Sequence, residues 1–277
     1  MDNSDDATIK GFGDEWERFD QNCLEQEELN SLFNKYFDIF PKQFLNKKNV
    51  GFDMGCGSGR WAKLIAPKVK KLHCIDPSPA INIAKNNLKS FKNCEFHNKG
   101  VSNINFSEES MDFGFSLGVL HHVPDTEAAI KSCVRLLKKN SPFLIYLYYS
   151  FDNKPFFYKV VWKITEILRF IISRLSYPLR YFCSQIIAFF IYIPLSRIAL
   201  ICEKIGFRKK FVENIPLSFY RSLSIYTIKT DALDRFGTRL EKRFSKREIY
   251  YMMKRSGLEK IRFSNDSPYW IAVGIKT

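Results

Sequence analysis

The segment VGFDMGCGSGRW, residues 50–61, constrains the fold of this chain more than any other stretch. A short apolar run ends in Asp53, and three glycines then follow at alternate positions: Gly55, Gly57 and Gly59. Apolar residues in 61–66 recur at helical spacing, so the glycines lie between a predicted strand and a predicted helix. Glycine permits positive φ and close approach of a ligand, and the first turn of a helix offers unpaired N–H groups. The pattern therefore predicts a site for a nucleotide-like ligand.

Two well-known glycine fingerprints do not fit this loop. The dinucleotide fingerprint needs glycines at relative positions one, three and six, and the sixth position counted from Gly55 is Arg60. A phosphate-binding P-loop needs a Gly-Lys-Ser or Gly-Lys-Thr ending, which the sequence lacks. The remaining pattern, an acid followed by alternating glycines, resembles motif I of the class I S-adenosylmethionine-dependent methyltransferases.

Downstream segments extend this resemblance over residues 48–150. The run LHCID ends in Asp76, about twenty positions after the loop, where Rossmann-like folds place a carboxylate on the ribose hydroxyls. The alternative role for Asp76 is to cap the next helix, which Ser78 and Pro79 open. The stretch SMDFGFSLGVLHHVPDT resembles the motif IV region of families that include the ubiquinone and menaquinone C-methyltransferases.

The resemblance implies S-adenosylmethionine as the cofactor, and it assigns residues to each part of that molecule. The strand-end acid and the glycine loop would hold the methionine part, and Asp76 the ribose. After the third predicted strand, Gly100 or Val101 stands where related enzymes present an acid or amide to the adenine. The implied cofactor residues are Asp53, Gly55, Cys56, Gly57, Gly59, Asp76, Gly100, Val101 and Leu117. No metal site is expected.

Two adjacent histidines, His121 and His122, follow the fourth predicted strand. Ligands of open α/β sheets bind at the carboxyl ends of the strands, and imidazole titrates near neutral pH. Both histidines are therefore candidate general bases, with His121 preferred, and the alternative is that one of them packs beneath the following helix. The NPPY signature of adenine and glutamine N-methyltransferases is absent, which favours an oxygen or carbon acceptor on a lipid, quinone or sugar.

The predicted organisation has four parts. Residues 1–47 form a helical extension, 48–150 the cofactor-binding core, 151–240 a helical insertion, and 241–277 the closing helix and strands. The resemblance implies a doubly wound, seven-stranded α/β sheet in which strands one and four are neighbours. Within the extension, Trp16 or Phe19 either covers the cofactor or packs on the outside of the sheet. Near the end of the chain, Ser245 and Glu248 predict a capping box.

The insertion combines basic and apolar character, with eleven bases and two acids in residues 154–210. Residues 159–175 predict an amphipathic helix with a basic face. Residues 181–196 carry no charge, but they are shorter than the roughly 20 residues that span a bilayer and contain Pro194, so no transmembrane helix is expected. The insertion suits an interfacial helix pair on anionic lipid. The alternatives are a cap on the core or on a second subunit, or one that encloses an apolar substrate.

Composition leaves three classes of function open. The net charge is +14, and because residues 1–30 hold ten acids and two bases, the rest of the chain is more basic still. The seven cysteines form neither a C-x-x-C pair nor a zinc-ligand spacing with histidine, so we expect reduced thiols. The acidic N-terminus resembles no secretory signal. We therefore expect the protein in the cytoplasm, or peripherally at the inner membrane surface. We expect a methyltransferase for a small-molecule, lipid-linked or sugar acceptor. The alternatives are an RNA methyltransferase and a non-catalytic membrane- or partner-binding protein, and the oligomeric state stays open.

Overall fold

The structure, a computed structural model, describes residues 3–21 and 23–277. It divides into two compact units. The sheet unit comprises Met1–Asn22, Leu29–Tyr149 and Leu240–Thr277. The helical unit comprises Cys23–Glu28 and Ser150–Arg239.

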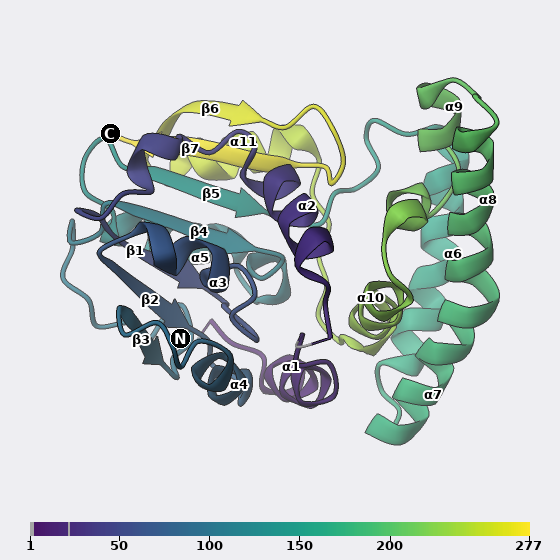
Figure 1. Cartoon of the computed structure of the whole chain (residues 1–277), viewed down its shortest axis with the longest axis horizontal. Coiled ribbons are helices and arrows are strands. Elements are labelled where there is room, and N and C mark those ends of the chain that lie inside the picture. Colours follow the sequence, from purple (N-terminus) through teal and green to yellow (C-terminus); the bar gives the residue numbers. More distant parts are fainter. Residues whose placement is uncertain (1–2, 22) are drawn as a thin grey trace. The chain divides into compact units, whose positions relative to one another are not determined.

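The sheet unit contains a seven-stranded sheet in the order β3-β2-β1-β4-β5-β7-β6 (Figure 1). Strands β1 to β5 are parallel, and β7 runs antiparallel between β5 and β6. The strands are β1 Val50–Met54, β2 Lys71–Ile75, β3 Cys94–His97, β4 Phe113–Leu117, β5 Pro142–Tyr146, β6 Leu258–Phe263 and β7 Ile271–Lys276. This order confirms the predicted sheet and the pairing of the first strand with the fourth.

Two glycine and phenylalanine pairs fix the register of β1 against β4. Gly51 lies opposite Phe113, and Phe52 lies opposite Gly114. A Cβ atom on either glycine would come 2.2 Å from the facing phenylalanine ring, so each ring occupies the space that glycine leaves. Phe52 and Phe113 are fully buried, and a slip of one residue would oppose ring to ring. This explains why a glycine stands inside the strand that leads to the loop.

Helices precede, connect and follow the strands of the sheet unit, and some of them begin at a side-chain cap. They are α1 Asp6–Arg18, α2 Gln26–Phe37, which begins in the helical unit, α3 Ala62–Ile65, α4 Ala80–Asn87, α5 Thr126–Leu136 and α11 Lys246–Arg255. The Asp125 carboxylate accepts from the Ala128 N–H and so caps α5. The predicted capping box of Ser245 and Glu248 is confirmed at the start of α11. These caps fix where α5 and α11 begin. The apolar faces of both helices belong to one core.

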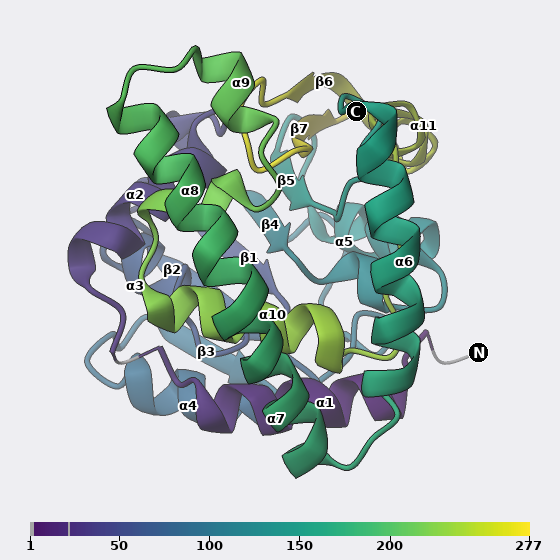
Figure 2. The same cartoon turned by 90° about the vertical axis from the view of Figure 1, so that its right-hand side faces the viewer.

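The helical unit is built from α6 Phe156–Ile172, α7 Tyr177–Ile187, α8 Ile193–Lys204, α9 Lys209–Glu213 and α10 Ile225–Gly237. Figure 2 shows α10 crossing behind α7–α8 and ending beside α6, and it contacts both α6 and α7. A π-helical segment, Ala188–Tyr192, joins α7 to α8. The expectation that Pro194 breaks this segment is therefore wrong. The wider π turn accommodates a residue that has no N–H to donate, and the helix continues to Lys204.

The continuous helix Tyr177–Lys204 is 28 residues long, and within the described part of the chain it is the one helix whose length and composition would suffice to cross a membrane. The expectation that this apolar segment is too short is corrected accordingly. Only 22% of its most apolar window is buried. Its buried side chains are mainly small or polar: Arg180, Ser184, Ala188, Tyr192, Ser196 and Ala199. Its large apolar side chains are exposed, with Phe189 at 64% and Phe190 at 69%. This is the reverse of a soluble amphipathic helix.

Candidate active site

The glycine loop requires glycine for both conformation and space. Gly55, Gly57 and Gly59 have φ of +78°, +52° and +80°, a region that other residues seldom adopt. A Cβ on Gly55 would come 2.3 Å from a Val119 methyl carbon. The Gly55 and Cys56 N–H groups both donate to the Ile75 carbonyl, at 2.7 and 3.0 Å. These bonds hold the loop against the carboxyl end of β2, beside the predicted ribose carboxylate.

Two buried carboxylates lie at this edge of the sheet. Asp53 is 1% exposed, and its Oδ2 has no hydrogen-bond partner among the described residues. The Asp76 Oδ2 accepts from the Gly57 N–H at 2.9 Å, and its Oδ1 accepts from the Ser78 N–H and hydroxyl at 2.9 and 2.6 Å. Burial raises the pKa of both carboxyls, and the Asp76 charge raises the Asp53 pKa further. The pair therefore favours a cationic ligand.

The residues present fit S-adenosylmethionine, which carries an ammonium group and a sulfonium. The unpartnered Asp53 oxygen is an acceptor for the ammonium, and both carboxylates complement positive charge. Open space for a ligand lies at Gly100 and at Gly118, where an added Cβ would meet no atom within 4 Å. Gly118 follows directly after Leu117, the last residue of β4. The structure thus brings the predicted methionine and ribose residues together.

Other predicted cofactor residues have a structural role in the same region. Val101 is buried in the core that α5 shares with the sheet, so its side chain packs inward. Burial raises the pKa of the Cys56 thiol to about 11, which keeps it protonated. Cys56 therefore lines the loop as a neutral group. Its backbone N–H, already bonded to Ile75, contributes more to the loop than its sulfur.

Helix α1 contacts the segments that follow β1, β2 and β4. The Trp16 indole lies over Gly57, where an added Cβ would be 3.1 Å from its Cε2 atom. Gly13 packs on Pro79 after β2, and the Phe12 ring lies 4.9 Å from the His122 ring after β4. Of the two alternatives for this helix, the structure favours the cover over the loop for Trp16. A cofactor in the loop would lie beneath this helix.

Sequence reasoning did not assign Arg60, the residue that breaks the dinucleotide fingerprint. Its guanidinium lies 4.5 Å from the centre of the Trp61 ring and 5.9 Å from that of Trp16. Its charge opposes the burial that raises the pKa of Asp53. Arg60 therefore contacts the tryptophan rings beside the loop and also acts to lower the Asp53 pKa. The only local signal for it was a cation between glycine and tryptophan.

The histidine turn, Leu120–His122, follows β4 as expected, but His121 is fully buried. Its ring centre lies 3.9 Å from those of His122 and Tyr148. Neither of its ring nitrogens has a hydrogen-bond partner within residues 3–21 and 23–277. The His122 Nδ1 lies 2.7 Å from the Leu240 carbonyl oxygen, to which it donates, so its Nε2 carries the lone pair. Either ring can therefore accept a proton, and neither is exposed to bulk water.

We expect His121 to stay neutral over the whole range in which an ordinary histidine titrates. Burial, then the His122 and Arg243 charges, hold its pKa well below the usual value. The unfolded chain takes up this proton more readily, so the contribution of His121 to stability is present above about pH 6.5 and falls as the pH is lowered. Proton NMR of its ring should show no titration between pH 8 and 6. A midpoint near 6.5 would contradict the buried placement.

The sheet order, the glycine loop and the two strand-end carboxylates define the fold of the class I S-adenosylmethionine-dependent methyltransferases. Residues 52–145 match the family described as "Methyltransferase domain". A crystal structure of a proposed methyltransferase from Bacillus halodurans C-125 superposes with a TM-score of 0.51 at 14% identity, covering 84% of this chain and 72% of that one. Residues 52–145 are thus a methyltransferase domain of this class, whose cofactor is S-adenosylmethionine.

Several relatives match over part of the chain, most of them named for tRNA, and two show the range of their names. One is the probable tRNA methyltransferase 9B of Mus musculus, 31% identical over 141 residues, covering 45% of this chain and 30% of that protein. The other is the ubiquinone biosynthesis O-methyltransferase of Coxiella burnetii (strain Dugway 5J108-111), 25% identical over 130 residues, covering 46% of this chain and 53% of that protein. The chain spans less than two thirds of the length of either relative. Their names differ in the acceptor, so they do not select one.

Proposed function

We propose that this chain transfers the methyl group of S-adenosylmethionine to an oxygen or carbon of an amphiphilic, lipid-linked acceptor at an anionic membrane surface. The observation that carries the acceptor class is the reversed polarity of the helical unit. Of the 23 large hydrophobic side chains that are exposed among the described residues, 20 lie between 156 and 211. Covering each would gain on the order of 1 kcal/mol, so together they favour an apolar environment strongly.

The charge on the same surface selects the partner. Seven bases within residues 154–210 are exposed: Lys159, Lys163, Arg174, Lys204, Arg208, Lys209 and Lys210. A second copy of the chain would bring like charges together, whereas anionic head groups attract each base by about 1 kcal/mol near the surface. The other four bases of 154–210 donate to backbone carbonyls inside the unit: Lys154, Arg169, Arg180 and Arg197. Exposed charge and exposed apolar surface therefore coincide.

The helical unit fits helices that lie in the plane of the membrane surface better than helices that cross the membrane. Helix α6 carries Lys159, Lys163, Glu166 and Arg169 within 17 residues, too many charges for a span. Helix α7 packs on α10, whose own side chains include Asp231 and Asp234. Both long helices expose apolar side chains while α10 covers their polar side. We therefore infer that α6 and α7–α8 lie in the interface with the apolar face toward the acyl chains.

Both attachment points of the helical unit lie beside the histidine turn. The chain leaves the sheet unit after Tyr149 and re-enters it at Leu240. The Lys242 N–H donates to the His121 carbonyl at 3.1 Å, and the Phe244 N–H donates to the Tyr148 carbonyl at 2.8 Å. The segments that tether the helical unit are therefore those that hold the candidate bases.

The proposed methyl transfer depends more on aligning the acceptor with the methyl donor than on activating the acceptor. When bound, S-adenosylmethionine supplies a methyl group on a good leaving group. The chain would hold the ammonium at Asp53 and the ribose at Asp76, and Trp16 would exclude water above the loop. Methyl donor and acceptor must meet at about 3–3.5 Å. If the acceptor is a hydroxyl, the His122 Nε2, whose lone pair the Leu240 carbonyl leaves free, accepts its proton.

RNA is the second candidate acceptor. One relative is named as a tRNA methyltransferase, and the net charge of +14 suits a polyanion. Phosphate binding would make affinity fall steeply with salt, because each neutralised phosphate releases counterions. The exposed apolar side chains have no role in that proposal. They are the reason for placing the lipid-linked acceptor first.

The decisive test combines vesicle flotation with transfer of a labelled methyl group. The full-length protein should float with phosphatidylglycerol-containing vesicles, and incubation with labelled S-adenosylmethionine and cell extract should place label in the organic phase. We expect the double variant Phe189→Asp/Phe190→Asp to lose at least about tenfold in vesicle binding, since two charges would enter the acyl region. Binding of S-adenosylmethionine should not change.

The matched control is Tyr250→Asp/Tyr251→Asp, which places the same charges on an exposed aromatic pair of α11 in the sheet unit. It should float like the unaltered protein. Label in the RNA fraction, together with no flotation on anionic vesicles, would overturn the proposed acceptor and favour the second candidate.

A further inference from the structure

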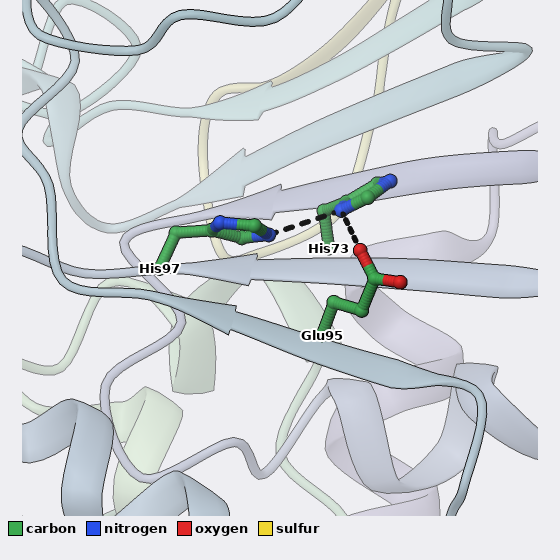
Figure 3. Close-up of side chains that lie close together, drawn as sticks. All are labelled: His73, Glu95 and His97. Carbon is green, nitrogen blue, oxygen red and sulfur yellow. Dashed lines mark hydrogen bonds and ion pairs between the residues drawn. The ribbon is translucent and has the colours of Figure 1, made fainter.

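A cluster of two histidines and one glutamate lies on β2 and β3, outside the site described above (Figure 3). His73 and Glu95 are directly opposite each other in the parallel register, and His97 follows Glu95 by two positions. Side chains at positions i and i+2 of a strand point to the same face. The three side chains therefore converge on one face of the sheet at its β3 edge.

The distances within the cluster suit a metal ion. The His73 Nδ1 lies 3.1 Å from the His97 Nε2 and 3.3 Å from the Glu95 Oε2. All three candidate ligand atoms lie within 4.8 Å of one another. Ligands at about 2.0–2.1 Å from a tetrahedral zinc ion are separated by about 3.3 Å. Two of the three separations already have this value, and a rotation of the exposed Glu95 side chain would bring the third to it.

We propose that His73, Glu95 and His97 bind one divalent transition metal ion, with Zn²⁺ as the expected occupant. The ligands are the His73 Nδ1, the His97 Nε2 and the Glu95 Oε2, and water completes a tetrahedron. Imidazole and carboxylate together suit zinc. Nothing in the candidate active site requires this ion.

The surroundings prepare the imidazoles for coordination. The His73 imidazole is buried and the His97 imidazole is partly buried, so both rings are shielded from bulk water. The Phe106 ring packs on both imidazoles, with ring centres 4.8 and 4.9 Å away, and restricts their orientation. Without a metal ion, one of these two rings donates its N–H to the other at 3.1 Å. A metal ion satisfies both lone pairs.

The competing partner of Glu95 is weak and leaves one oxygen available. The Lys71 ammonium lies 2.5 Å from Oε1, and the two side chains are 41% and 45% exposed. Exposed pairs of this kind contribute only about 0–1 kcal/mol. Binding a metal through Oε2 does not require this pair to break. Lys71 would then orient the Glu95 carboxylate through Oε1, the oxygen that does not bind the metal.

A metal at this place would fasten the edge strand. β3 pairs only with β2, and its last residue is the ligand His97. The His97 carbonyl accepts from the Asp76 N–H at 3.1 Å. The ion would therefore stabilise the strand end next to the predicted ribose carboxylate. We infer a structural role, because all three ligands come from neighbouring strands and none lies in the glycine loop or the histidine turn.

Metal binding is tested on the full-length protein after chelation, by calorimetric titration with Zn²⁺ and by the absorption spectrum with Co²⁺. We expect one Zn²⁺ per chain, a higher melting temperature with Zn²⁺, and Co²⁺ bands without the sulfur charge-transfer absorption that any of the seven cysteines would give. His97→Gln and the shape-conserving Glu95→Gln should each weaken binding, His97→Gln by more than about 100-fold. Glu108→Gln removes an exposed carboxylate elsewhere and should change nothing.

Two results would overturn the proposed site. One is no stoichiometric Zn²⁺ in the unaltered protein. The other is binding that survives both His97→Gln and Glu95→Gln or that shows thiolate absorption with Co²⁺. Circular dichroism of each variant separates loss of the ligand from loss of the fold, and Glu95, being exposed, can be changed without opening the core.

Discussion

Replacing Gly57 by valine is expected to lower the affinity for S-adenosylmethionine by more than about 100-fold while the protein stays folded. Gly57 has a φ of +52°, which costs other residues about 1–2 kcal/mol. A Cβ there would already be 3.1 Å from the Trp16 indole, and the valine methyls reach further. The valine side chain would clash with the Trp16 ring that covers the loop. Calorimetric titration with S-adenosylmethionine measures the change.

Gly206→Val is the matched control for the strain at Gly57. Gly206 has a φ of +93°, but an added Cβ there would meet no atom within 4 Å. The backbone penalty is therefore similar, and the crowding is absent. We expect this variant to bind S-adenosylmethionine as the unaltered chain does. Unchanged affinity in Gly57→Val would mean that the cofactor does not use this loop, whereas equal losses in both variants would point to a general effect of strain.

The cofactor half of the site was predictable because its information is local. Asp53 and the glycines are contiguous, and Asp76 ends the next strand, so parallel β1 and β2 must bring the two carboxyls to one edge. The burial of His121 was not predictable, since it depends on Tyr148 and on Lys242, which returns to it from 121 positions along the chain. The cover by Trp16 depends likewise on where a helix docks.

In the insertion, periodicity predicted the helices but not which side they bury. Amphipathic spacing is the same whether the polar or the apolar face points inward. Here Arg180 donates to the Gly237 carbonyl 57 positions away, and that contact turns the polar side inward. The cluster of His73, Glu95 and His97 escaped prediction for a related reason. His73 and His97 are 24 positions apart and meet only through the register of β2 and β3.

Replacing Glu166 by glutamine is expected to destabilise the helical unit by about 3 kcal/mol, the second large effect that the structure predicts. The Glu166 carboxylate pairs with Arg169 on α6 at 2.9 Å and with Arg235 on α10 at 2.5 Å. Both arginine side chains are about 10% exposed. Glutamine keeps the shape but removes the carboxylate charge that faces two buried guanidinium groups, the costly way to break a buried pair. Hydrogen exchange of peptides from α6 and α10 should increase.

The control and the pH dependence distinguish this network from an ordinary surface pair. Glu203→Gln breaks a pair with Arg221 of 2.7 Å in which Glu203 is 46% exposed, so it should cost no more than about 1 kcal/mol.

Burial raises the Glu166 pKa, but Arg169 and Arg235 outweigh burial and hold the pKa below its usual value. The unfolded chain then binds the proton more readily, so the stabilisation is complete above about pH 4.3 and is lost as the pH falls through the folded pKa. The difference between Glu166→Gln and the unaltered chain should therefore shrink in acid. A difference that is constant from pH 7 to 3 would show that lost packing, and not lost charge, destabilises the variant.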